Sequence, residues 1–114
     1  MVYNNPIFGP APDNVNERLA FVLMPFRDEF TIIYESIVKP IVKNKGLDCK
    51  RADDYMTTRA VIQDIWWGIC ESLLVIADTT GLNHNVMYEL GIAHAMGKRL
   101  SSLKDNFIIF QLQR

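Results

Sequence analysis

Two short runs of consecutive apolar residues most constrain how this chain can fold. Residues 19–24, LAFVLM, are stopped by Pro25, and residues 73–77, LLVIA, end on Asp78. Each run is too short for a helix of its own and has no polar face, which is typical of a strand buried on both sides. Such strands occur in parallel sheets whose two faces are covered by helices, so the chain is expected to form an α/β fold.

Helical periodicity is visible between and after these runs. In residues 27–46 apolar residues recur at steps of three and four, and Pro40 inside this pattern predicts a kink or a local break. A second helix, with Thr57 or Thr58 as its cap, and a third helix closed by Gly97 are also predicted. These two helices span residues 57–72 and 83–97, and further strands are expected within residues 47–54 and 106–113.

The alternation of strands and helices predicts right-handed crossovers and a three-layer α/β/α fold of the flavodoxin/Rossmann-like type. Its parallel sheet should contain four to five strands. Residues 18–114 are expected to form this single domain, because a chain of 114 residues is long enough for one core and too short for two. Residues 1–17 hold three prolines and show no period, so we predict a flexible N-terminal arm there.

Composition and charge exclude several classes of function. A net charge of −1 gives no electrostatic reason to expect nucleic acid or an anionic membrane as a partner, and the basic pairs at 50–51 and 98–99 are interpreted as solvated surface. No apolar run could span a membrane and no signal peptide is visible, which predicts a cytoplasmic protein. Cys49 and Cys70 match no zinc or redox spacing, so no metal and no cofactor are expected, and Cys70 is predicted to lie in the core.

Ligands of an open parallel sheet bind beyond the carboxyl ends of its strands. This rule selects the loop after the first apolar run, the acids that follow the next two strands and the start of the third helix. The binding residues predicted in this way are Met24, Pro25, Phe26, Arg27, Asp53, Asp78, Asn83 and Asn85. For Asp53 and Asp78 a simple role in a turn or an Asx-type cap remains an alternative. Neither GxGxxG nor GxxxxGK[ST] occurs, so a Rossmann dinucleotide site and a P-loop are not expected.

Glu89 is the acidic residue whose placement is hardest to explain. It falls in the expected first turn of the third helix and shares a face with Ile92, Ala93 and Met96. The helix macrodipole would favour a carboxylate there by roughly 0.3–1 kcal/mol, whereas a capping box counted from Asn85 fails by one residue. A charge on a buried face needs a partner or an opening to solvent, and the cleft at the strand ends is the nearest opening. Burial should raise the pKa of Glu89, while the helix N-terminus should lower it.

Two further features lie in the second helix. Asp64 is a candidate second carboxylate, with a solvent-facing position as the alternative interpretation. The pair Trp66–Trp67 should place one ring inward and one outward, and the outer ring could belong to a partner surface.

The segment ADTTGLNHNVMYELGIAHAMGK, preceded by FVLMPF, GLDCKRAD and IQDIWWGICESLLVI, resembles the nucleoside 2-deoxyribosyltransferase-like family of small α/β domains, which are related to TIR-like domains that cleave or sense NAD. The resemblance covers about residues 19–98 and implies a nucleoside or nucleotide cleft. It further implies that Glu89 is the nucleophile at the anomeric carbon and that Asp64 contacts the base and assists proton transfer. The loop of residues 24–27 would close over the base or the sugar. The family has an Asp for the sugar hydroxyls where this chain has Asn83.

Three functions follow as hypotheses. The first is transfer or hydrolysis at an N-glycosidic bond, the second is cleavage of NAD as in TIR-like domains, and the third is a non-catalytic nucleotide-binding or protein-interaction module. The third is motivated by Asn83, by the outward tryptophan ring, and by RLSSLKDN at residues 99–106, interpreted as an insertion that leaves little chain behind it. Expected partners are a nucleoside, nucleotide or NAD-like small molecule. A homo-oligomer with Trp66 or Trp67 near its contact is also expected, because a small sheet exposes its edges.

Overall fold

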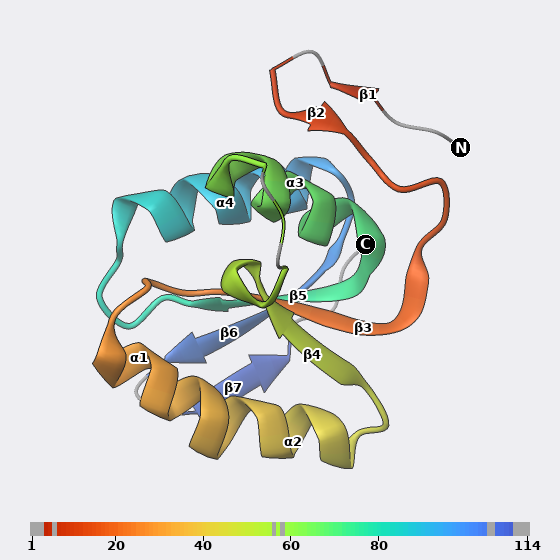
Figure 1. The fold of residues 1–114 in the computed structure, drawn as a ribbon. Helices are drawn as coiled ribbons and strands as arrows, with labels where there is room; N and C mark the ends of the chain where they lie inside the picture. Colours follow the sequence, from red (N-terminus) through yellow and green to blue (C-terminus); the bar gives the residue numbers. More distant parts are fainter. Residues whose placement is uncertain (1–3, 6, 56, 58, 105–106, 111–114) are drawn as a thin grey trace.

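The protein is built around a five-stranded sheet in the strand order β4-β3-β5-β6-β7 (Figure 1). The computed structural model describes residues 4–5, 7–55, 57, 59–104 and 107–110. The first four strands of this order run parallel, and β7 pairs with β6 in the antiparallel direction. The strands are β3 (Asn16–Leu23), β4 (Asp48–Arg51), β5 (Ser72–Asp78), β6 (Arg99–Lys104) and β7 (Phe107–Phe110).

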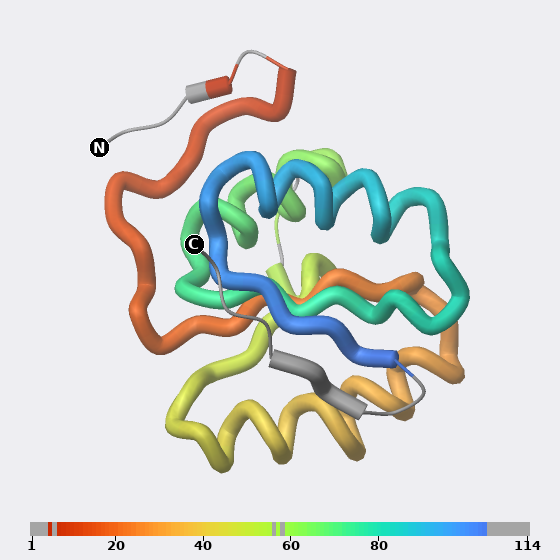
Figure 2. The backbone as a smooth tube through the Cα atoms, turned by 180° about the vertical axis from the view of Figure 1, so that it is seen from behind, coloured from red at the N-terminus to blue at the C-terminus, as the bar shows by residue number. Residues whose placement is uncertain are grey.

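Helices cover both faces of this sheet, which confirms the predicted three-layer α/β/α architecture (Figures 1 and 2). One layer contains α1 (Asp28–Ile33) and α2 (Lys39–Asn44), and the other contains α3 (Val61–Glu71) and α4 (His84–Ala95). Alternate residues of β3 serve the two layers. Phe21 packs with α3 and α4, while Ala20 and Val22 pack with the α1–α2 layer. The apolar run of residues 19–24 is therefore continuous because both of its faces are buried.

Gly68 allows α3 to approach the sheet closely. A Cβ atom at this position would overlap the ring of Phe21, whose side chain is fully buried. Any larger residue would push α3 away from β3. Gly68 therefore also fixes the position of the pocket-lining residues that α3 carries.

The expected disturbance at Pro40 takes the form of a π-helical turn, Tyr34–Val38, between α1 and α2. Proline has no N–H group and cannot donate to the carbonyl four residues earlier. The N–H of Lys39, just before it, donates to the carbonyl of Tyr34, five residues back. The chain thus remains helical, but it is wound more loosely for one turn.

The interpretation of residues 99–106 as an insertion is wrong. Residues 99–104 form β6, the fourth parallel strand, which pairs with β5 from Leu74↔Arg99 to Asp78↔Leu103. The strand shows no continuous apolar run because one of its buried positions is the polar residue Ser101. Leu100 and Leu103 are buried in the same strand. The strand predicted within residues 106–113 is present as β7, and it adds an antiparallel edge to the sheet; residues 106 and 111–113 lie outside the described part.

Residues 4–5 and 7–15 contain a short ribbon that packs on α3, an arrangement that the sequence did not predict. Strands β1 (Asn4–Asn5) and β2 (Gly9–Pro10) pair antiparallel, and the ring of Phe8 lies 5.4 Å from that of Trp66. Ala11 completes a small buried cluster with Trp66 and Cys70, so the core position of Cys70 is confirmed. The flexibility of residues 1–17 stays a prediction, and β3 begins inside that range at Asn16.

Trp66 is buried and Trp67 is half-buried, as the predicted inward and outward rings require.

Within the described part of the chain, no helix is long and apolar enough to cross a membrane.

Candidate functional site

A pocket of about 350 Å³ lies at the carboxyl end of β3, beside the N-terminal halves of α3 and α4. The connection from β3 leads to β4 on one side of the sheet, whereas the connection from β5 leads to β6 on the other. The pocket therefore occupies the crevice at which a doubly wound sheet binds its ligands. Its volume falls at the lower end of the range for small-molecule sites.

Most of the predicted site residues line this one pocket. They come from the β3–α1 loop and from the start of α4, and they are Met24, Pro25, Phe26, Arg27, Asn83, Asn85 and Glu89. Ala52, Val61, Ile65 and Val86 add apolar walls, although they were not among the predicted site residues. Ala52 directly follows β4, and the other three residues stand in the first two turns of α3 and α4.

Glu89 is the sixth residue of α4, in its second turn, and its side chain enters the pocket wall with an exposed fraction of 9%. No hydrogen bond or ion pair reaches its carboxylate from any residue that the structure describes. Burial raises the pKa of Glu89 from its ordinary value of 4.5 to about 7. The predicted first-turn position is wrong because the helix begins at His84, and the macrodipole acts mainly within the first turn. The macrodipole therefore does not explain this carboxylate.

Asn83 is the N-cap of α4 and also lines the pocket. Its side-chain oxygen accepts hydrogen bonds from the backbone N–H groups of Asn85, at 3.0 Å, and Val86, at 3.1 Å. The choice of Asn85 as the cap, on which the capping-box test was based, is wrong by two residues. Because the oxygen of Asn83 is engaged by the helix, its NH₂ group is the part left to bind a ligand.

The second predicted catalytic carboxylate, Asp64, does not line the pocket. It is buried rather than solvent-facing, with an exposed fraction of 6%. The hydroxyl of Thr57 donates to both of its oxygens, at 2.8 and 3.1 Å. The Nε of Arg59 lies 2.9 Å from Oδ1 as an ion pair, although its N–H direction falls outside hydrogen-bond geometry. Thr57 therefore binds Asp64 instead of capping α3, whose N-cap is Ala60; Thr58 lies outside the described residues.

Asp53 and Asp78 also lie outside the pocket lining. Asp53 is exposed and forms a two-point ion pair with Arg51. Asp78 is buried at the end of β5, and its Oδ1 accepts the N–H of Thr80 at 2.9 Å. This is the Asx-type turn that was the alternative interpretation of Asp78.

Arg51 and Lys98, both interpreted from the sequence as solvated surface, instead form buried or structural contacts. Arg51 is buried, with an exposed fraction of 5%, at the carboxyl end of β4. The Nζ of Lys98 donates to the carbonyls of Cys70, at 2.9 Å, and Ser72, at 2.7 Å, and so satisfies backbone acceptors where α3 ends. For Arg51 a signal was present in the sequence, because an arginine followed by two acids at a strand end is able to form an internal fork.

Comparison with known proteins gives a likeness at the level of structure. No protein-family model and no curated protein matches this chain. A solved structure, the 2-desoxiribosyltransferase from Leishmania mexicana, matches with a TM-score of 0.60 and 25% sequence identity. The match covers 76% of this chain and 64% of that chain, so this chain spans less than two thirds of the matched structure's length. The likeness supports the nucleoside 2-deoxyribosyltransferase-like fold that the sequence predicted.

Proposed function

We propose that this domain binds a nucleoside or nucleotide in the pocket and cleaves or transfers at its N-glycosidic bond, with Glu89 as the nucleophile. The observation that carries the proposal is one buried carboxylate, without a partner among the described residues, in the wall of a pocket at the carboxyl edge of the sheet. Burying a carboxylate without a partner costs desolvation free energy that a neutral residue at the same position would not cost. Such groups are concentrated at functional sites.

Nucleophilic attack at the anomeric carbon requires a carboxylate that is shielded from water but still able to ionise. One oxygen of ionised Glu89 attacks the anomeric carbon, the bond from that carbon to the base nitrogen breaks, and the base leaves with the bonding electron pair and takes up a proton. Water or a second base then displaces Glu89 from the sugar, which gives hydrolysis or transfer. Because burial raises the pKa of Glu89 to about 7, its ionised, reactive form is accessible near neutral pH.

The loop of residues 24–27 and the start of α4 supply contacts for the two halves of the ligand. The ring of Phe26, half exposed at the pocket, offers a face on which a base can stack. The amide groups of Asn83 and Asn85 offer donors to sugar hydroxyl oxygens or to a phosphate. We assign the base to the Phe26 side and the sugar to the side of Glu89 and α4.

Asp64 is proposed to act on the departing base, and this role requires a rearrangement. Val61 and Ile65 of the same helix line the pocket, whereas Asp64 itself does not. Thr57 and Arg59 occupy its oxygens in the structure. We propose that ligand binding displaces the side chains of Thr57 and Arg59 from Asp64 and so exposes Asp64 to the base.

A non-catalytic binding module is the second candidate, and the contacts of Asp64 favour it. If Thr57 and Arg59 keep their contacts with Asp64 when a ligand is bound, Glu89 is the one carboxyl group among the described pocket-lining residues, and no second one protonates the base. The domain would then bind a nucleoside or nucleotide without turnover. The predicted homo-oligomer and the relation to NAD-cleaving TIR-like domains stay proposals, and NAD is tested beside the nucleosides because its nicotinamide is also held by an N-glycosidic bond.

The test is a panel of nucleosides, nucleoside monophosphates and NAD, incubated with the wild type and with Glu89→Gln, with and without a second free base as acceptor. Chromatography measures the free base or nicotinamide released and any exchanged nucleoside. We expect release by the wild type and a loss of at least roughly 10³-fold in Glu89→Gln, because glutamine has the same size and cannot attack. Binding without release would favour the non-catalytic module, and equal release by both proteins would exclude Glu89 as the nucleophile.

A further inference from the structure

We infer that Arg51 is a positioning residue that fixes the β3–α1 loop as a wall of the pocket, acting through Met24 and Phe26. The inference rests on the proposed function, because it assigns a cause to the shape of that same pocket. Arg51 itself is not among the pocket-lining residues, whereas Met24 and Phe26 are.

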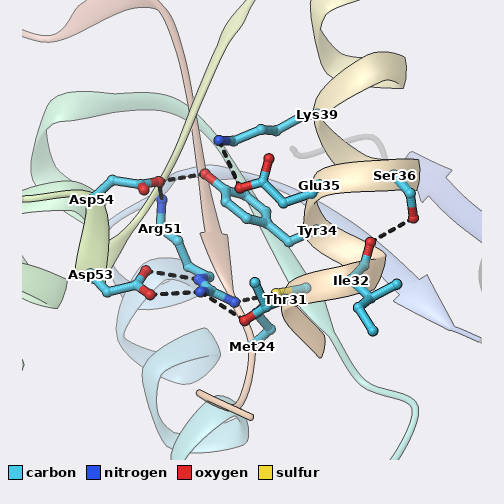
Figure 3. Close-up of polar contacts among 10 residues, drawn as sticks. All are labelled: Met24, Thr31, Ile32, Tyr34, Glu35, Ser36, Lys39, Arg51, Asp53 and Asp54. Atoms are coloured by element: carbon cyan, nitrogen blue, oxygen red, sulfur yellow. Dashed lines mark hydrogen bonds and ion pairs between the residues drawn. The ribbon is translucent and has the colours of Figure 1, made fainter. Parts of the chain in front are cut away.

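The strand register brings Arg51 to this loop. Arg51 is the last residue of β4 and pairs with Val22 of β3, two residues before Met24. Its Nη1 donates to the sulfur of Met24 at 3.5 Å, and its Nη2 donates to Oγ1 of Thr31 at 3.1 Å (Figure 3). One side chain thus holds the residue that begins the loop and a residue in the helix that follows it.

Asp53 sets the direction of the guanidinium group. Nε of Arg51 donates to Oδ1 of Asp53 at 2.8 Å, and Nη2 donates to Oδ2 at 2.6 Å, which gives the two-point fork shown in Figure 3. Asp54 fixes the backbone at the same place, because its Oδ2 accepts the N–H of Arg51 at 2.8 Å and the hydroxyl of Tyr34 at 2.6 Å. The hydrogen bonds to Asp53 raise the pKa of Arg51, so the group stays charged although it is buried.

Two aromatic rings lie against the guanidinium plane. The centroid of the Tyr34 ring is 4.8 Å from Cζ of Arg51, and that of the Phe26 ring is 5.5 Å away. Tyr34 is fully buried in the core, whereas Phe26 is half exposed at the pocket. The guanidinium group therefore links Phe26 to the rigid core through Tyr34. This contact restricts the motion of the Phe26 ring, to which we assign base stacking.

Lysine could keep the charge at this position but not the geometry. The Asp53 fork and the contacts with Thr31 and Met24 use three nitrogens in one plane, and an ammonium group offers a single nitrogen without a stacking face. The loop would then keep its sequence but lose its fixed position. Phe26 would spend less time in the orientation that binds a base, and the ligand would bind more weakly.

A residue that only supports folding would behave differently. Its loss lowers the melting temperature and the fraction of active protein, so the apparent kcat falls while KM is unchanged. A positioning residue of the pocket wall raises KM or the dissociation constant of the ligand in protein that is still folded. Whether kcat or KM changes therefore distinguishes a residue that only supports folding from one that positions the pocket wall.

The experiment compares Arg51→Lys and Asp53→Asn with the wild type and with Arg18→Lys, a matched change at an exposed arginine of β3. Methionine methyl-labelled protein is titrated with the nucleosides and monophosphates of the panel. The NMR signal of the Met24 methyl group gives the dissociation constant, and release of free base gives KM and kcat. We expect the Met24 signal to move, and KM and the dissociation constant to rise by roughly tenfold, in Arg51→Lys. The rise in Asp53→Asn should be smaller, and Arg18→Lys should match the wild type.

The outcomes distinguish this inference from the proposed function. Unchanged KM and dissociation constants in folded Arg51→Lys and Asp53→Asn would overturn the inference and leave the proposed function standing. Should Arg51→Lys fail to fold, Asp53→Asn decides, because it removes the fork through an exposed side chain. A wild type that binds a nucleoside without cleaving it would contradict the proposed chemistry, while the dissociation constants would still test Arg51. A wild type that binds none of the panel would overturn both.

Discussion

Glu89 and Asp64 are carboxylates of nearly equal burial on two adjacent helices, and they differ in what surrounds them. Asp64 receives two hydrogen bonds from Thr57 and an ion pair from Arg59. Glu89 receives no such contact from the described residues and lines the pocket. Burial alone therefore does not mark a reactive acid. A carboxylate that is buried and satisfied stabilises the fold, whereas one that is buried and left without a partner is available to a ligand.

The largest expected difference between the two carboxylates is the sign of their effect on stability. The pKa of Glu89 is raised from 4.5 to about 7, so the folded state binds more protons than the unfolded state between these values. The free energy of unfolding should fall as the pH rises through this window, by up to about 3 kcal/mol, and stay lower above it. Glu89→Gln should remove this loss and match the wild type near pH 4.

Urea unfolding of the wild type and Glu89→Gln across this pH range measures the effect. A Glu89→Gln variant less stable than the wild type at pH 8 would contradict this expectation, because it would reveal a stabilising partner of the Glu89 carboxylate.

The opposite sign is expected for Asp64. Replacement by asparagine leaves Arg59 without its counter-charge and weakens the bonds from Thr57, which should lower the free energy of unfolding by about 2 kcal/mol. Thermal or urea unfolding at pH 7 measures the loss, with Arg59→Gln as a partner variant. A double-mutant cycle measures the coupling energy between Asp64 and Arg59, and a value near zero would mean that this pair contributes nothing to stability.

The smallest effect is expected at Asn83, which stands between the helix and the pocket. Asn83→Ala should destabilise the protein by about 1 kcal/mol, because two backbone N–H groups of α4 lose their acceptor. Asn83→Asp keeps an acceptor and places a negative charge near the start of α4, so its stability should stay close to that of the wild type. If Asn83→Ala is as stable as Asn83→Asp, the cap contributes little. Ligand titration of the same two variants tests the amide NH₂ as a binding group.

Much of the fold could be predicted from the sequence because its signals are local. The runs of residues 19–24 and 73–77 form β3 and β5 at the centre of the sheet, and apolar periodicity located the helices that cover them. The strand β6 was missed because Ser101 is buried in it and breaks the apolar run. Its antiparallel partner β7 depends on a pairing that no periodicity reveals.

The pocket-lining residues could be predicted where the rule of strand ends applied directly, as for residues 24–27 and Glu89. The contacts around the carboxylates could not. Asp64 is bound by side chains from the segment before α3, and Arg51 reaches a loop 27 residues away in the chain. Such contacts arise from the register and the turns of the folded chain, and a single sequence contains no direct sign of them.

The most direct test of the account is to look for the sugar on Glu89. The wild type is incubated with a nucleoside that it cleaves, quenched in acid and digested, and the peptide that contains Glu89 is examined by mass spectrometry. We predict a peptide heavier by one dehydrated sugar, absent from Glu89→Gln and removed when a second base is added before the quench. Cleavage with no adduct on Glu89, or an adduct on Asp64 instead, would contradict it.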